Sequence, residues 1–185
     1  MNRYLNTEAI VINKKKLDES DLLVTILTPS KGKIVCLAKG AQSIKSHRLS
    51  HLQIGNITKC HLYTKNNRYW ISESYSLDSF LKNPKKLTQI NLLFYFLEII
   101  NHLIPENQHI EKVYDISKLI INSICQNNLI KYIQNEINLI KILGFGVPPE
   151  IISAFNQKDY KTTQKLIQKY FESIIEHPIH SKKLF

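Results

Sequence analysis

The first residues that could carry chemistry are three acids, Asp18, Glu19 and Asp21, in one short polar segment. Carboxylate oxygens suit a hard divalent cation, and a small metal-dependent nuclease would need such a cluster. Three acids in a loop without partner ligands elsewhere are usually solvated. We therefore expect them to lie solvated on the turn before the apolar run that follows, and the nuclease stays open as an alternative.

Histidine and cysteine give a second candidate site. His47 and His51 are four residues apart and Cys60-His61 follows, but structural zinc sites use paired ligands at short spacings, and the first cysteine pair is missing. Cys36, Cys60 and Cys125 are odd in number and widely separated, which is typical of a reducing cytosol. The sequence predicts no metal site and no disulfide framework.

Nucleotide and nucleophile motifs are absent from the sequence. Gly32-Lys33 lacks the earlier glycine of a phosphate-binding loop, and Gly144-Phe145-Gly146 lacks the third glycine of a dinucleotide fingerprint. No nucleophile elbow is present. We therefore predict a protein that is not an enzyme, with no catalytic residues and no cofactor.

Basic residues point instead to a binding surface. The net charge is +10, of which residues 1–82 carry +7 and residues 83–185 carry +3. A positive surface attracts polyanions without a sequence code, whereas solvated lysines are the simpler alternative. The predicted DNA-binding residues are Lys14, Lys15, Lys16, Lys31, Lys33, Lys39, Lys45 and Arg48. We expect the first three in a loop after the first strand and the next two beside a hairpin.

Aromatic residues are interleaved with this charge. Tyr63, Tyr69, Trp70 and Tyr75 could stack on the bases of a nucleic acid. Neighbouring residues of a strand face opposite sides, so Tyr69 and Trp70 cannot both face a ligand. We assign Trp70 to the core.

Five short runs rich in β-branched and aromatic residues must position these side chains. They cover residues 9–12, 22–28, 34–38, 54–63 and 69–75. Pro29 to Gly32 predicts a hairpin turn between the second and third runs, and Lys65-Asn66-Asn67 predicts another. Five strands in about 75 residues suit an OB-fold, a small Greek-key barrel that binds oligonucleotides. Residues 41–52 would form an irregular or helical insertion.

Beyond Pro84 the apolar residues recur at helical spacing. One stripe before Pro105 consists of Ile90, Leu93, Phe94, Leu97, Ile100 and Ile104. A second spans 113–124, and a third ends at Leu143 beside a capping Gly144. Pro148-Pro149 opens a short helix, and residues 160–175 form the last one. The predicted class is α+β, with an OB-fold nucleic-acid-binding domain at 1–82 and an all-α helical domain at 83–185.

The N-terminal part also resembles a known family, the bacterial recombination mediator RecO. The matching residues form an ordered string: Ala9-Ile10-Val11, Glu19-Ser20-Asp21-Leu22-Leu23-Val24, Leu27-Thr28-Pro29, Gly32-Lys33-Ile34 and Ala38-Lys39-Gly40-Ala41, with Ser46 following. A weaker match covers residues 135–145 and ends in Leu143-Gly144-Phe145. Some relatives carry a four-cysteine cluster after this motif, but residues 146–155 here contain no cysteine.

The resemblance implies the same OB-fold and a role in DNA repair and homologous recombination. A RecO-like protein binds single- and double-stranded DNA and anneals complementary strands. It works with RecR and the C-terminal tail of single-strand-binding protein, and so helps to load the recombinase RecA on coated DNA. The short C-terminal part puts any function of a longer helical domain in doubt.

The sequence shows neither a signal peptide nor a membrane-spanning segment. Residues 1–7 lack the apolar core of a signal peptide, and no apolar stretch approaches the roughly 20 residues that span a bilayer. We expect a cytoplasmic, nucleoid-associated protein without a membrane partner. A general OB-fold RNA-binding or ribosome-associated protein explains the charge and the barrel equally well.

Overall fold

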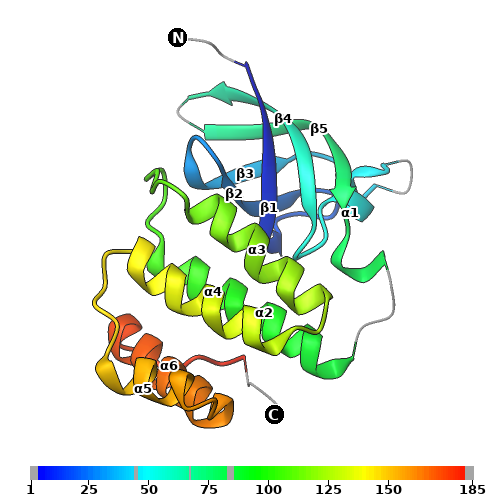
Figure 1. Ribbon diagram of the computed structural model, residues 1–185. Helices are drawn as coiled ribbons and strands as arrows, with labels where there is room; N and C mark the ends of the chain where they lie inside the picture. Colours follow the sequence, from blue (N-terminus) through cyan, green and yellow to red (C-terminus); the bar gives the residue numbers. More distant parts are fainter. Residues whose placement is uncertain (1–3, 44–45, 67, 83–85, 182–185) are drawn as a thin grey trace. The chain divides into compact units, whose positions relative to one another are not determined.

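The computed structural model describes residues 4–43, 46–66, 68–82 and 86–181. The chain divides into two compact units, one of residues 1–84 with 104–109 and one of residues 85–103 with 110–185. The first unit is a closed barrel and the second is a set of helices (Figure 1). This confirms the predicted α+β class, with an N-terminal five-stranded OB-fold barrel followed by an all-α part.

Five strands and one short helix build the barrel. They are β1 (Tyr4–Lys16), β2 (Leu22–Thr28), β3 (Gly32–Ala38), α1 (Arg48–His51), β4 (Ile57–Lys65) and β5 (Arg68–Asp78), with a 3-10 turn at Phe80–Lys82. The strand order is β1-β2-β3-β5-β4, and only the β3–β5 pair is parallel. Both predicted hairpins are confirmed, since β2 pairs antiparallel with β3 and β4 with β5.

The long strand β1 closes the barrel because it pairs with two neighbours. Its first half pairs with β4 and its second half with β2, with a bulge between Val11 and Asn13. Bulges bend a strand, which lets one strand serve both edges of a closing sheet. The sequence predicted only residues 9–12 here, because the flanking Asn, Glu and Lys residues have low strand propensity, whereas pairing of the backbone with β2 and β4 decides the length of the strand.

Alternating small and branched residues fill the barrel interior. They include Ala9, Val24, Ile34 and Ile71, together with the two buried cysteines Cys36 and Cys60. Burial raises the pKa of both thiols, so they stay protonated at neutral pH and behave as small apolar side chains.

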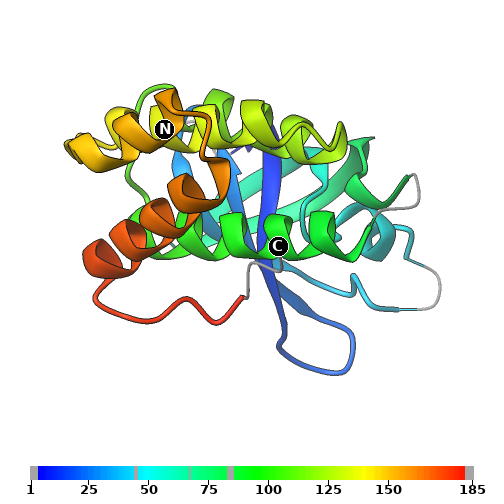
Figure 2. The same ribbon diagram turned by 60° about the horizontal axis from the view of Figure 1, so that its bottom comes forward.

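The second unit contains α2 (Leu87–Leu103), α3 (Val113–Cys125), α4 (Leu129–Ile142), α5 (Pro149–Asn156) and α6 (Tyr160–Ile175). The predicted end of α4 is confirmed, because Gly144 has a φ of 82° and Phe145 N donates to Ile140 O at 3.1 Å. This hydrogen bond satisfies the carbonyl of Ile140 at the end of the helix. Helices α5 and α6 lie beside one another in Figure 2. Phe94, which the pattern placed in the apolar stripe of α2, is 43% exposed.

Glu98 on α2 holds the last described segment of the chain. Its two carboxylate oxygens accept hydrogen bonds from the backbone N–H groups of His180 and Ser181, each at 2.8 Å. Burial alone would raise the pKa of this carboxyl, but the hydrogen bonds from Ser181 and His180 outweigh it and lower the pKa. The ionised form is therefore the one that binds the segment.

This anchor predicts an acid-sensitive contribution to stability. Because the folded pKa of Glu98 is lowered, its contribution is complete above the ordinary glutamate pKa of about 4.3 and is lost as the pH falls further. Glu98→Gln is expected to remove part of the loss of stability between about pH 5 and pH 3, by less than about 1 kcal/mol because the group is partly solvated. Urea unfolding across this range measures it, and identical pH profiles for the two proteins would contradict the role of the charge.

Candidate nucleic-acid interface

Lys14, Lys15 and Lys16 lie inside β1, so the prediction of a loop after the first strand is wrong. They pair with Val24, Leu23 and Leu22 of β2, because the pairing between β1 and β2 continues as far as Leu22, the first residue of β2. Lys14 is half-buried and its Nζ donates to Gln53 Oε1, and this burial lowers its pKa. Lys15 and Lys16 are exposed, and in Figure 2 the blue β1–β2 connection extends away from the other strands.

Cross-strand register decides which basic residues share one end of the barrel. Lys16 pairs with Leu22, and Leu22 pairs with Ala38, so Lys39 leaves β3 at the end where Lys14–Lys16 lie. Lys31 stands in the β2–β3 turn at the opposite end. We call Lys14, Lys15, Lys16 and Lys39 the lysine cluster. Lys45 lies outside the described residues.

Lys33 is only 6% exposed. Burial lowers the pKa of its ammonium, and the charge of Glu106 acts in the opposite direction. Its carbonyl accepts a hydrogen bond from Asn107 N at 2.8 Å, and Lys33 forms a parallel bridge with Glu106. The residue therefore holds segment 104–109 along the free edge of β3, and we do not include it in the lysine cluster.

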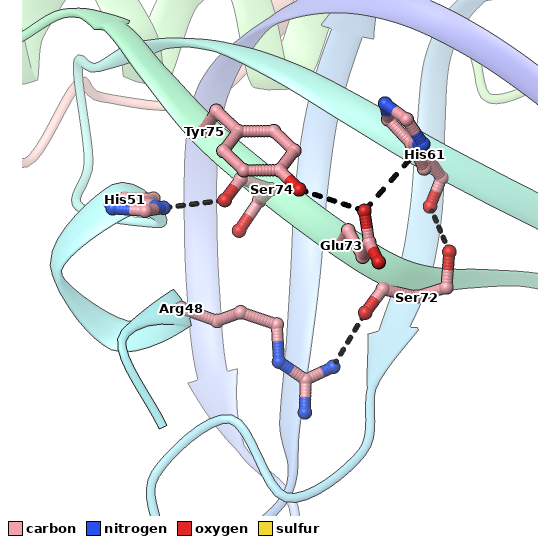
Figure 3. A network of polar contacts seen from close by, with 7 residues as sticks. All are labelled: Arg48, His51, His61, Ser72, Glu73, Ser74 and Tyr75. Carbon is pink, nitrogen blue, oxygen red and sulfur yellow. Dashed lines mark hydrogen bonds and ion pairs between the residues drawn. The ribbon is translucent and has the colours of Figure 1, made fainter. Parts of the chain in front are cut away.

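Arg48 at the start of α1 is committed to backbone groups. Its guanidinium donates to Lys39 O at 2.6 Å, Ile71 O at 3.2 Å and Ser72 O at 3.3 Å. Figure 3 shows the bond to Ser72. These bonds link α1, β5 and the end of β3, so the positive charge of Arg48 is held in one place near the backbone of Lys39.

Neighbouring polar contacts complete this network, which lines an open pocket of about 490 Å³ (Figure 3). His51 Nδ1 contacts the carbonyl of Ser74, and a carbonyl only accepts, so this nitrogen carries the proton. Tyr75 donates to Glu73 Oε2 at 2.8 Å, and His61 Nδ1 lies 3.8 Å from the same oxygen. The contact of His51 joins α1 to β5, and those of Glu73 lie within β5 and between β4 and β5.

The acidic segment has a structural use. Asp21 is 9% exposed and its Oδ1 accepts from Gly40 N at 2.7 Å and from Ser20 Oγ at 3.3 Å. Its carbonyl accepts from Leu17 N at 3.1 Å, and Ser20 O accepts from Gln42 N at 2.9 Å. The segment lies on the turn before β2 as expected, but Asp21 is buried rather than solvated and joins that turn to the loop after β3.

Removing the Asp21 carboxylate leaves the Gly40 N–H without its partner. Asp21→Ala is expected to lower the free energy of unfolding by about 1–3 kcal/mol, the cost of an unsatisfied polar group with little access to water. Asp21→Asn keeps an acceptor and is expected to lose less. Urea denaturation of the three proteins tests this, and equal stability of Asp21→Ala and the native chain would contradict the structural role.

The histidine and cysteine candidates do not come together. Cys60 is buried inside the barrel, whereas its neighbour His61 faces Glu73 on the outside. Across residues 4–43, 46–66, 68–82 and 86–181, no group of three or more His, Cys, Asp or Glu side chains is arranged to hold a metal ion. Within the same ranges, no helix has the length and apolar composition needed to cross a membrane.

An apolar and aromatic row crosses the outside of the barrel. Directly paired residues follow one another across five strands: Lys15 with Leu23, Leu23 with Leu37, Leu37 with Trp70, Trp70 with Tyr63, and Tyr63 with Tyr4. Directly paired residues share a face of the sheet. The indole of Trp70 stacks on Tyr63 with ring centroids 5.8 Å apart and planes at 15°.

This row reverses the prediction for the two neighbouring aromatics. Tyr69 packs against the barrel core, and Trp70 belongs to the outer face. The alternation itself was predicted correctly, but its phase depends on Leu37 and Tyr63, which the sequence does not place next to Trp70. Arg68 shares the face of Trp70, being two residues earlier on the same strand. Sequence reasoning missed Arg68, although this spacing could have revealed it.

A pocket of about 410 Å³ opens on the same face. Its walls include Leu23, Leu37, Arg68, Trp70, Glu106 and Asn107. It thus combines apolar walls with one cation, one carboxylate and one amide. Trp70 Nε1 is buried and has no hydrogen-bond partner within the described part of the chain.

Comparison with known proteins agrees with this barrel. Residues 1–80 match a family model described as recombination protein O N terminal. A DNA repair protein RecO of Thermoanaerobacter is 27% identical over 146 residues, which cover 77% of this chain and 59% of that protein. The RecO protein of Acetivibrio thermocellus is 31% identical over 121 residues, covering 65% of this chain and 47% of the relative.

The chain therefore spans about half the length of these curated relatives. Another relative, the RecO protein of Roseiflexus, is 30% identical over 115 residues, which cover 62% of this chain and 40% of that protein. The chain is similar to the DNA repair proteins RecO, and its residues 1–80 match the model of the N-terminal domain of that family.

Proposed function

We propose that this protein acts in DNA repair and homologous recombination as a mediator. It binds single- and double-stranded DNA, anneals complementary strands and helps to load a recombinase on DNA coated by single-strand-binding protein. The observation that carries the proposal is the match of residues 1–80 to the recombination protein O N-terminal domain. The names of the relatives, DNA repair protein RecO, support the same role.

The lysine cluster is the proposed site for the DNA backbone. The last three residues of β1, Lys14–Lys16, and Lys39, which follows β3, lie at one end of the barrel, because both strands pair with β2. Cations grouped in this way displace the counterions of two phosphate backbones and lower their mutual repulsion, while base pairing supplies the free energy of annealing. The proposed mechanism breaks no covalent bond, so the proposed role is that of a binding protein rather than an enzyme.

The two parts of the chain have different proposed tasks. Residues 1–82 bind nucleic acid, and residues 83–185 supply a helical surface for protein partners. The proposed partners are RecR and the C-terminal tail of single-strand-binding protein, with RecA reached indirectly. The site of action is the cytoplasm, at the nucleoid.

An annealing assay tests the proposal. Two complementary strands are mixed with the full-length protein, either bare or coated with single-strand-binding protein, without ATP and with a chelator present. Annealing of both pairs is expected, because the proposed mechanism uses neither nucleotide hydrolysis nor a metal. Failure to anneal either pair, together with tighter binding to RNA than to DNA of the same sequence, would favour the general RNA-binding alternative.

A further inference from the structure

The pocket beside Trp70 has features of a site for a flat, partly polar ligand. Its volume of about 410 Å³ lies in the range of small-ligand sites, roughly 300–1,000 Å³. Leu23 and Leu37 provide apolar walls, and Trp70 provides an aromatic ring already stacked on Tyr63. Such a ring pair is a platform on which a further ring can stack.

Polar groups on this pocket differ from those of a phosphate site. Arg68 offers hydrogen-bond donors to a ligand. Glu106, however, places a carboxylate in the same pocket, and this carboxylate would repel a bound phosphate. The edge of a nucleobase carries both donors and acceptors, which match a mixed set of Arg, Glu and Asn.

Cations lie on both sides of the pocket, where the backbone of a bound strand would run. The exposed Lys15 stands next to Leu23 in the row of paired residues. On the other side, Lys65 is exposed at the β4–β5 turn, where it is paired with Arg68 of the pocket wall. A strand with one base in the pocket could therefore contact cations with its flanking phosphates.

We propose that the pocket formed by Leu23, Leu37, Arg68 and Trp70 binds an unpaired nucleobase, so that this face of the barrel distinguishes single strands from duplex. In a duplex both faces of each base are covered by neighbouring bases, and the ring of Trp70 cannot reach them. The lysine cluster, in contrast, recognises phosphates and accepts either form. This inference rests on the proposed nucleic-acid binding and assigns the base-specific part of it.

The native chain contains its own reporter, because Trp70 is the single tryptophan. Its fluorescence is titrated with a single strand of about 15 nucleotides, within OB-fold footprints, with an abasic strand of equal length and with a duplex. Fluorescence anisotropy of a dye on each nucleic acid measures binding separately. Quenching of Trp70 is expected with the base-containing strand only, although all three bind.

The outcomes separate this inference from the proposed function. Binding of all three nucleic acids without quenching, or equal quenching by the abasic strand, would overturn the base pocket and leave the phosphate site standing. Binding of none would overturn both. Quenching by a short acidic peptide but by no strand would assign the pocket to a protein partner and also overturn the inference.

Variants supply a second readout. Trp70→Leu is expected to weaken binding of the base-containing strand about 5- to 100-fold, the range that one stacked base contributes, and to leave the abasic strand unaffected. Trp70→Phe should retain most of the affinity. Phe94→Leu is the matched control, since Phe94 is a 43% exposed aromatic that does not line this pocket. Equal weakening of both strands by Trp70→Leu, with the fold intact by circular dichroism, would contradict base binding.

Discussion

A variant with glutamine at Lys14, Lys15, Lys16 and Lys39 is expected to bind single-stranded DNA roughly 10²- to 10³-fold more weakly than the native chain at about 0.1 M salt. Each phosphate contact contributes about 0.7 to the slope of log affinity against log salt on single strands, so loss of four contacts lowers the slope by about 3. The reason is the release of condensed counterions. Anisotropy titrations at several salt concentrations measure both quantities.

The matched control removes the same number of charges from another region. Four exposed lysines of the helical unit, each changed to glutamine, serve this purpose: Lys131, Lys141, Lys161 and Lys165. This control isolates net charge from position, because long-range attraction falls equally in both variants while local contacts differ. A control that loses as much affinity and slope as the cluster variant would show that the lysine cluster is not the phosphate site.

Gly32→Ala is expected to lower the free energy of unfolding of the barrel by about 3 kcal/mol. Gly32 has a φ of 65°, where an L-residue costs about 1–2 kcal/mol. A Cβ there would lie 1.9 Å from Gln108 O and 2.7 Å from Gln108 C. These are backbone atoms, so no side-chain rotation relieves the overlap, and overpacking adds about 1–3 kcal/mol. The hydrogen bond from Asn107 N to Lys33 O is expected to open.

Gly40→Ala is the control for this variant. Gly40 has a φ of 64°, but a Cβ there would meet only Arg48 Nη2, at 3.9 Å. It therefore carries the backbone strain without the overlap. Urea denaturation gives the stabilities, and hydrogen exchange of the Asn107 amide reports on segment 104–109. Equal losses for Gly32→Ala and Gly40→Ala, with unchanged protection of Asn107, would mean that the segment does not depend on this contact.

Local patterns in the sequence were enough to predict most of the elements. The strands at 22–28 and 34–38 and the turn between them follow from β-branched runs and from Pro29 to Gly32, and the end of α4 follows from Gly144. In each case the prediction depends on residues close in the chain, because side-chain alternation, turn geometry and helix capping are local features. The absence of nucleotide-binding and nucleophile motifs, and the excess of charge in residues 1–82, also follow from the sequence by itself.

Tertiary structure alone decided which of these residues lie together. Lys39 joins Lys14–Lys16 because β1, β2 and β3 share a register, while Lys31 stands at the other end of the same hairpin. Trp70 lies outside the barrel because it pairs with Leu37 and Tyr63.

Lys33 is buried because segment 104–109 returns to the edge of β3 from about 70 residues further along the chain. Such placements depend on barrel closure and on contacts between distant residues. A local sequence pattern predicts neither barrel closure nor contacts between distant residues. The sequence therefore determined the elements and their charge, whereas the fold determined the lysine cluster and the aromatic row.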